Sequence, residues 1–260
     1  MNTIVCIKQV PETTDVKINP ETNTLIREGV KSIINPFDMY AIEEAIRLKE
    51  RFGGKVMIVT MGPPQAEAAL REAISMGADE GYLVCDRAFA GSDTWATSYT
   101  LAWAIKKLGQ FDLIICGKQA SDGDTAQVGP GISTHLNIPQ VTYVKKVEEV
   151  TDKLMRLERM LEEGYEVIET PLPALLTVVK EINEPRIPSL KGLMRAKSAK
   201  ITVFAQKDLN LDEQQIGLCG SPTQVIKIFS PAPRVGGQIL KGEVSEIAKQ
   251  LVDLIKDEVK

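Results

Sequence analysis

The polar loop at residues 117–133, GKQASDGDTAQVGPGIS, carries the side chains best suited to ligand chemistry. Thr125 and Gln127 can donate hydrogen bonds to phosphate or ribose oxygens, and Gly123 permits a close or positive-φ backbone. Asp122 and Asp124 suit ribose hydroxyls, or the cap of a following helix, better than they suit phosphate. The loop is therefore interpreted either as a nucleotide site or as a plain polar turn with a helix cap, and its residues alone leave both open.

The usual catalytic and metal-binding patterns are absent from the sequence. It has no GxGxxG and no GxxxxGK[ST] motif, and its only histidine, His135, is expected to be a solvated or capping residue. The four cysteines are scattered without a CxxC pair, so buried free thiols are expected rather than a metal site. If chemistry occurs here, a cofactor is expected to bring it.

The composition predicts a cytoplasmic protein with a substantial core. The chain has 260 residues, of which 43% are hydrophobic, and a formal net charge of −4 with both signs mixed along its length. No basic stripe could follow a phosphate backbone, so nucleic acid is not expected as a partner. No apolar run approaches the roughly 20 residues needed to cross a bilayer, and the N-terminus lacks a signal-peptide pattern, so no membrane span is expected.

Apolar runs alternate with segments of helical period in the first half of the chain. Strands are predicted at 3–10, 55–62, 80–86 and 111–117, and helices at 38–54, 64–78 and 92–109. Strands that are apolar at nearly every position, separated by helices, favour a doubly wound α/β fold with a mostly parallel sheet. After Gln140 the pattern changes to period two, which indicates an antiparallel extension.

Two domains are predicted. Residues 1–205 are predicted to form an α/β domain that binds the nucleotide. In such sheets ligands bind beyond the carboxyl ends of the strands. Residues 206–260 lose periodicity until an amphipathic segment at 243–259, which places Ile247, Leu251, Leu254 and Ile255 on one face. This second part is interpreted as an arm that wraps a partner.

Several motifs, in order along the chain, resemble the β subunit of electron-transfer flavoproteins. They are VCIKQVPE, NPFDMYAIEEAIRLKE, GPPQAEAALREAISMGAD, GKQASDGDTAQVG, LERMLEEGYEVIETPLPALLTV and NEPRIPSLKGLMRAKSAKI. The resemblance covers essentially the full length. It implies an adenine-nucleotide-binding, universal-stress-like α/β fold and a heterodimer with a flavin-carrying α subunit, on which the arm and its helix pack.

The resemblance also implies which residues line the nucleotide site. They are Cys6, Asn35, Pro36, Phe37, Asp38, Met61, Thr94, Thr97, Asp122, Gly123, Asp124, Thr125, Ala126, Gln127, Val128, Gly129, Pro130, Ser221, Thr223 and Gln224. Thr94 also allows a simpler interpretation as a helix cap, and residues 221–224 as a plain turn.

Two occupants of the site remain open. Ordinary members of the family hold AMP there as a structural nucleotide, and their loop typically reads Gln-Thr-Gly-Gln. Here the loop reads Gln127-Val128-Gly129-Pro130, which, together with SDTWATS and GSPTQV, resembles the electron-bifurcating branch with a second FAD. That branch implies an anaerobic electron carrier in which this FAD takes a hydride from NADH. One electron then passes to ferredoxin or flavodoxin, and the other passes through the α-subunit FAD to an acyl-CoA dehydrogenase-type flavoenzyme.

A docking segment and a third function complete the expectations. PSLKGLMRAK, residues 188–197, resembles the family's recognition loop, in which Leu190 would dock into the dehydrogenase beside Lys191 and Arg195. The alternative is an amphipathic turn with Leu190 and Leu193 packed inward. A universal-stress-like nucleotide sensor is the candidate from another class, although such a sensor needs neither the arm nor the 157–178 motif.

Overall fold

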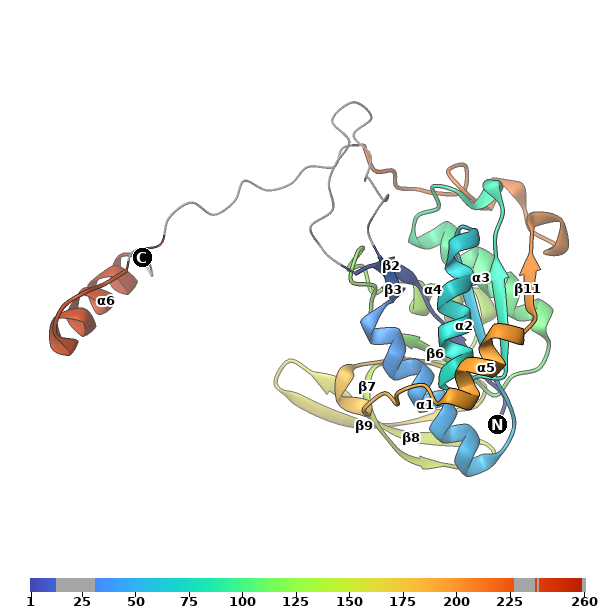
Figure 1. Cartoon of the computed structure of the whole chain (residues 1–260), viewed down its shortest axis with the longest axis horizontal. Coiled ribbons are helices and arrows are strands. Elements are labelled where there is room, and N and C mark those ends of the chain that lie inside the picture. The colour runs from blue at the N-terminus through green and yellow to red at the C-terminus, as the bar shows by residue number, and fades with distance from the viewer. Residues whose placement is uncertain (13–30, 227–236, 238, 259–260) are drawn as a thin grey trace. The chain divides into compact units, whose positions relative to one another are not determined.

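The computed structural model describes residues 1–12, 31–226, 237 and 239–258 (Figure 1). A nine-stranded sheet has the order β11-β5-β4-β1-β6-β10-β7-β8-β9, and the first seven of these strands run parallel. Its strands are β1 (Thr3–Cys6), β4 (Val56–Met61), β5 (Glu80–Val84), β6 (Leu113–Gly117), β7 (Gln140–Val150), β8 (Leu154–Leu161), β9 (Gly164–Pro171), β10 (Ala174–Val178) and β11 (Ile201–Phe204). The predicted α/β class with a mostly parallel sheet is confirmed.

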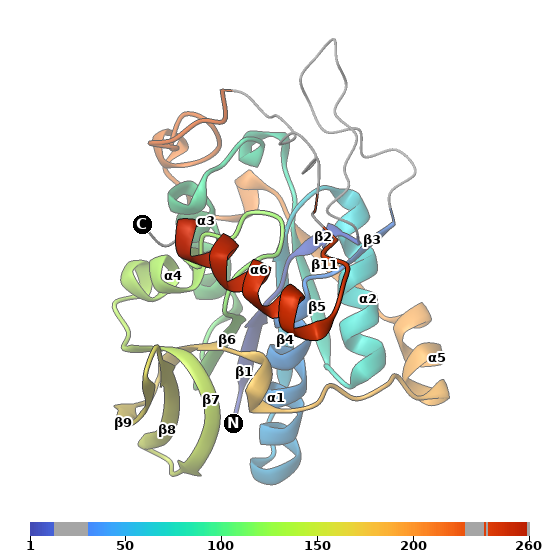
Figure 2. The same ribbon diagram turned by 90° about the vertical axis from the view of Figure 1, so that its left-hand side faces the viewer.

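Helices cover both faces of the sheet (Figure 2). One face carries α1 (Pro36–Phe52) and α2 (Glu67–Met76), and the other carries α3 (Thr94–Leu108) and α4 (Val128–Leu136). A further helix, α5 (Leu190–Ser198), packs on α2. Single 3-10 turns occupy η1 (Pro64–Ala66), η2 (Arg87–Phe89), η3 (Lys180–Ile182), η4 (Gln206–Asp208) and η5 (Glu213–Gln215).

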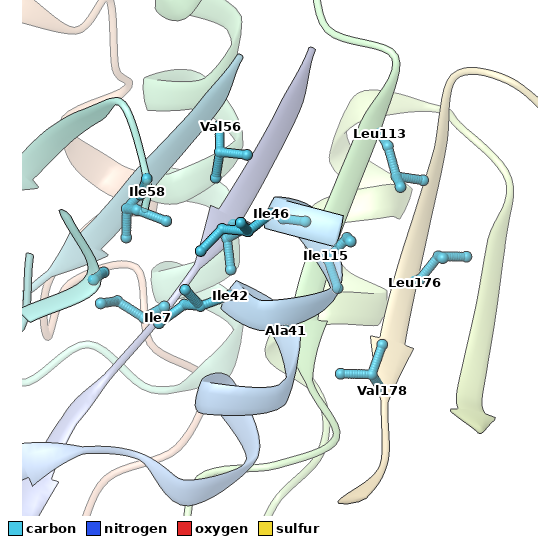
Figure 3. Close-up of a cluster of buried hydrophobic side chains, with 14 of the residues drawn as sticks. Ile7, Ala41, Ile42, Ile46, Val56, Ile58, Leu113, Ile115, Leu176 and Val178 are labelled. Atoms are coloured by element: carbon cyan, nitrogen blue, oxygen red, sulfur yellow. The ribbon is translucent and has the colours of Figure 1, made fainter. Parts of the chain in front are cut away.

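The strands are apolar throughout because alternate residues face opposite helix layers. Val5, Ile58 and Ile115 belong to the core beneath α1 and α2, whereas their neighbours Ile4 and Ile114 belong to the core beneath α3 and α4. Figure 3 shows the first of these cores, in which side chains of α1 lie against the central strands. Burial on both faces is what a continuous apolar run predicts.

The period-two region forms the extension that its pattern predicts. Strands β7, β8 and β9 pair antiparallel as a meander, and β10 then returns to lie parallel between β6 and β7. The predicted strand at 3–10 is divided, because Lys8 is exposed and β1 ends at Cys6. Its second part, β2 (Gln9–Pro11), pairs instead with β3 (Ser32–Ile34) in a separate two-stranded sheet.

The chain divides into two compact units, Met1–Ile226 and Lys227–Lys260. Residues 206–226 pack within the first unit, where Leu209 and Ile216 are buried beneath α3, so this unit extends past the predicted boundary at residue 205. In the second unit, α6 (Val244–Glu258) is an amphipathic helix, as predicted, and Leu251, Leu254 and Ile255 on it are exposed. The role of this unit as a partner-wrapping arm stays a prediction.

Candidate nucleotide site

The candidate site lies at the point where the strand order of the parallel sheet reverses. From β1, the chain builds outward through β4 and β5 on one side and then returns to place β6 on the other side. The connections after β1 and β6 therefore diverge and leave a crevice at the carboxyl ends of these strands, which is where ligands bind in doubly wound sheets. The loop that suggested a nucleotide site follows β6 directly.

Asn35, immediately before α1, holds the beginning of that loop. Its side chain is buried, its Nδ2 donates to the carbonyl oxygen of Gln119 at 2.8 Å, and its Oδ1 accepts from the backbone N–H of Ser121 at 3.0 Å. Pro36 then starts the helix and Phe37 is half-buried. The NPFD motif thus starts α1 and, through Asn35, also holds the beginning of the loop in place.

Asp38 joins the ends of the two central strands. Its carboxylate is buried, with Oδ2 accepting from the N–H of Lys8 at 2.7 Å and Oδ1 accepting from the N–H of Gly117 at 3.2 Å. Burial raises the pKa of Asp38 from 3.8 to about 7, although the bonds from Lys8, Asn35 and Gly117 lower it. Asp38 therefore positions the walls of the crevice through its backbone partners.

The loop after β6 is turned by residues in the left-handed region. Asp124 and Ala126 have φ values of 52° and 55°, a conformation that costs non-glycine residues energy and is concentrated at functional sites. Asp122 forms an ion pair with Lys8 at 2.7 Å, and Gln119 donates a hydrogen bond to Asp124. Thr125, like Asp124 and Gln127, is exposed at this edge.

The N-terminus of α4 is open to an anion. Gln127 precedes the helix without capping it by a side-chain hydrogen bond, and no acidic residue lies in the first turn, which begins Val128-Gly129-Pro130. Gly129 is buried, and a Cβ there would lie 2.9 Å from the Thr177 methyl group. Unpaired backbone N–H groups and the helix dipole favour negative charge at such an end.

The N-terminus of α3 is different, because it carries an anion of its own. Asp93 caps the helix, with Oδ1 accepting from the N–H groups of Trp95 at 2.9 Å and Ala96 at 3.1 Å. Burial alone would raise the pKa of Asp93, but its hydrogen bonds outweigh burial and lower the pKa, which keeps the carboxylate ionised. Thr94 Oγ1 donates to Gln127 Oε1 at 2.9 Å and so links α3 to the loop.

Residues 221–224 meet the same end of α3. Ser221 Oγ accepts from the N–H of Asp93 at 2.9 Å, and both the N–H and the hydroxyl of Thr223 donate to Asp93 Oδ2, at 3.0 and 2.8 Å. Gln224 is exposed beside them. The structure therefore brings this segment to α3, where the sequence alone allowed a plain turn.

The remaining predicted site residues lie at the same edge of the sheet. Cys6 and Met61 end β1 and β4, and Thr97 lies in the first turn of α3. Cys6 is buried and in register with Cys116 of β6. Contact with the Cys6 thiol, together with burial, raises the pKa of Cys116 well above its ordinary value, so the Cys116 thiol stays protonated.

His135 lies in an aromatic cluster, so its expected role as a solvated or capping residue is wrong. It lies edge-on to Trp95 and Tyr99, with ring centroids 4.9 and 5.5 Å away, and 6.4 Å from Trp103. Burial, with a smaller contribution from Lys106, lowers the pKa of His135. The helical spacing of the three aromatic residues along 95–103 was the signal in the sequence.

The predicted docking segment is the helix α5, capped by Ser189. Leu190 is 83% exposed and Lys191 is exposed, so the leucine does not pack inward. Arg195 is committed to the fold, because its Nη2 donates to the carbonyl oxygens of Ile74 at 2.7 Å and Ala78 at 2.6 Å at the end of α2.

Other kinds of site find no support in the described residues. Within 1–12, 31–226, 237 and 239–258, no three His, Cys, Asp or Glu side chains gather as metal ligands would. In the same part of the chain, none of the helices combines the length and the apolar character that crossing a membrane requires.

Comparison with known proteins identifies the family. Residues 22–209 match the electron transfer flavoprotein domain. An electron transfer flavoprotein subunit beta from Thermoanaerobacterium thermosaccharolyticum is 55% identical over 254 residues, 97% of each chain. The caffeyl-CoA reductase–Etf complex subunit CarD of Acetobacterium woodii is 51% identical over 99% of this chain and 98% of its own, and the protein FixA of Azotobacter vinelandii is 50% identical over 90% and 85%. The chain belongs to the electron transfer flavoprotein family, among its beta subunits.

Proposed function

We propose that this chain pairs with a flavin-carrying α subunit and binds a second FAD in the crevice at the carboxyl edge of its sheet. The observation that carries the proposal is the length of the polar wall. It runs from the 122–127 loop, through the hydrogen bond between Gln127 and Thr94, to residues 221–224. A mononucleotide needs only the first part of this wall, whereas a dinucleotide has a second phosphate and a longer sugar chain to satisfy.

The groups along the wall fit the parts of FAD. The uncapped start of α4 suits the diphosphate, because its N–H groups and dipole face an anion. Thr94, Thr125 and Gln127 offer hydroxyl and amide groups to sugar and ribityl oxygens. Asp122, already paired with Lys8, adds an acceptor for a ribose hydroxyl without leaving its charge unpaired.

The residues of this chain bind and orient the cofactor and hold no acid or base for it. FAD supplies the redox chemistry when bound, because it can accept a hydride from NADH and pass electrons on singly. Asn35 and Asp38 keep the loop and the two strand ends in place, and the protonated Cys116 thiol adds no charge beside them. The proposed acceptors are ferredoxin or flavodoxin and, through the α-subunit FAD, an acyl-CoA dehydrogenase-type flavoenzyme.

The docking surface for that flavoenzyme is proposed to be α5. Its exposed apolar residues Leu190 and Met194, with Lys191 beside them, give an anchor of the kind that transient interfaces use. The name of the relative CarD, a subunit of a caffeyl-CoA reductase–Etf complex, supports a partner that acts on a CoA ester.

The alternative within the family is AMP in the same crevice. AMP would use the start of α4 and the 122–127 loop and would leave residues 221–224 without a ligand, and the subunit would then scaffold the α-subunit flavin. Membership of the electron transfer flavoprotein family favours either of these carriers over a universal-stress-like sensor.

The nucleotides released from the denatured, purified αβ complex test the proposal. Two FAD and no AMP per dimer are expected, whereas one FAD and one AMP would overturn the second flavin. In a matched pair of variants, Thr94→Val should lower the FAD content, because the link to Gln127 is lost. Thr134→Val should not, since the Thr134 hydroxyl bonds to Pro130 O within α4.

A further inference from the structure

Asp86 and Asp93 each accept hydrogen bonds from two places: the start of the helical segment that follows them, and the distant segment that follows β11. Asp86 caps η2 through Oδ1, which accepts from the N–H of Ala88 at 3.1 Å, and its Oδ2 accepts from the N–H of Gln206 at 3.1 Å. Asp93 caps α3 through Oδ1, and its Oδ2 takes both donors of Thr223. Each carboxylate therefore caps the start of a helical segment and also holds part of the distant segment 206–223.

Glycines allow the two segments to interlock. Gly91 has a φ of 77°, and a Cβ on it would lie 2.6 Å from Leu218 Cγ. Gly217 has a φ of 57°, and a Cβ there would overlap the carbonyl oxygen of Ala88. Between these contacts the N–H of Asp212 donates to the hydroxyl of Tyr99 at 3.0 Å, so residues 206–223 follow loop 86–93 and α3 closely.

We propose that Asp93 is a positioning residue that holds residues 221–224 against the start of α3 and so keeps one wall of the nucleotide site in place. The inference rests on the proposed function and deepens it. Three hydrogen bonds join Asp93 to this segment. The N–H and the hydroxyl of Thr223 donate to Asp93 Oδ2, and the N–H of Asp93 donates to Ser221 Oγ.

The charge of Asp93 has a second consequence for the ligand. A carboxylate bound to the first N–H groups of α3 satisfies them and offsets the dipole of that helix. A phosphate is then repelled from α3 and directed to the start of α4, which has no acidic residue in its first turn. At the start of α3 the ligand therefore meets neutral groups of the protein, such as the hydroxyl and backbone amide groups of Thr94, Ser221 and Thr223.

The test uses the full αβ complex after removal of its nucleotides, with FAD titrated back and its binding followed by flavin fluorescence. Asp93→Asn and Thr223→Val should each raise the Kd of the second FAD about tenfold or more, which corresponds to ~1.4 kcal/mol. Thr223→Ser should restore the wild-type Kd, because it keeps both donors. Asp86→Asn is the matched control, which should lower the Tm of the complex with an unchanged Kd.

The outcomes separate this inference from the proposed function. A second FAD that binds Asp93→Asn and Thr223→Val as tightly as wild type overturns the positioning role while leaving the bifurcating assignment intact. Native wild-type complex that releases AMP in place of a second FAD overturns that assignment. AMP would leave residues 221–224 without a ligand, so that outcome also overturns the role of Asp93 in positioning them for the nucleotide.

Discussion

Replacing Asp38 by asparagine should make the stability of the protein less dependent on pH. The carboxyl group is 5% exposed, and burial raises its pKa from 3.8 to about 7. The folded state therefore binds a proton more tightly than the unfolded state does. The stability from this difference is fully present below pH 3.8 and is lost as pH rises to 7, because the carboxylate must then be ionised inside the core.

The size of the effect follows from the two pKa values. A difference of about 3 between them corresponds to ~4 kcal/mol in the free energy of unfolding over the whole range, at about 1.36 kcal/mol per pH unit. Roughly 2–3 kcal/mol of this should be lost between about pH 5 and pH 8. The asparagine side chain cannot titrate, so the stability of Asp38→Asn relative to wild type should rise by that amount over the same interval.

Urea unfolding of the nucleotide-free, full-length chain at several pH values measures this difference directly. Taking the difference between variant and wild type cancels the titration of other groups. Asp38→Ala serves as the control, since it lowers stability at every pH by leaving a cavity but must show the same pH trend relative to wild type. Parallel curves for wild type and both variants would show that Asp38 is ionised throughout, and the reasoning from burial would be refuted.

Three further predictions concern other parts of the chain. Gly117→Ala should lower stability by about 1–3 kcal/mol in urea unfolding and reduce the nucleotide content, because a Cβ would overlap Asp38 Oδ1; Gly164→Ala, which has open space, should change neither. Leu190→Ala should slow electron delivery to the partner flavoenzyme in stopped-flow assays, with flavin content unchanged. A chain ending at Ile226 should lose only the far-UV circular dichroism of α6 and fail to co-purify with the α subunit, and an intact dimer would contradict the arm.

Much of the fold could be predicted because its strands, helix ends and hairpins leave recognisable patterns in short stretches of the sequence. The buried parallel strands give apolar runs, and the start and end of α3 show through Asp93 and Gly109, whereas α1 begins at Pro36, two residues before the predicted start. The period-two stretch gives the β7–β9 meander, whose pairing needs only neighbouring segments. The loop after β6 could be found for a similar reason, since its glycine and polar residues stand directly behind an apolar strand.

The C-terminal part of the first unit could not be predicted in this way. Segment 206–223 is fixed by contacts with residues more than a hundred positions earlier, such as those of Asp93 with Thr223 and Tyr99 with Asp212. Bonds between a side chain and a distant backbone leave no period in either segment, so the stretch looked irregular. The same limit applies to Asp38, since nothing near it predicts that its partners are Lys8 and Gly117.

The helix α5 shows that a basic residue near a predicted docking residue need not be available to a partner. Lys191 and Arg195 both carry a positive charge, yet Arg195 donates to the carbonyl oxygens of Ile74, in the last turn of α2, and Ala78, just after it, where a cation also offsets the helix dipole. Gly192 permits this close approach, because a Cβ on it would overlap Ser75 O. A partner that docks on α5 would therefore meet an anchored helix whose exposed side chains include the apolar Leu190, Leu193 and Met194 beside Lys191 and Lys197. Its binding should depend more on apolar burial than on salt concentration.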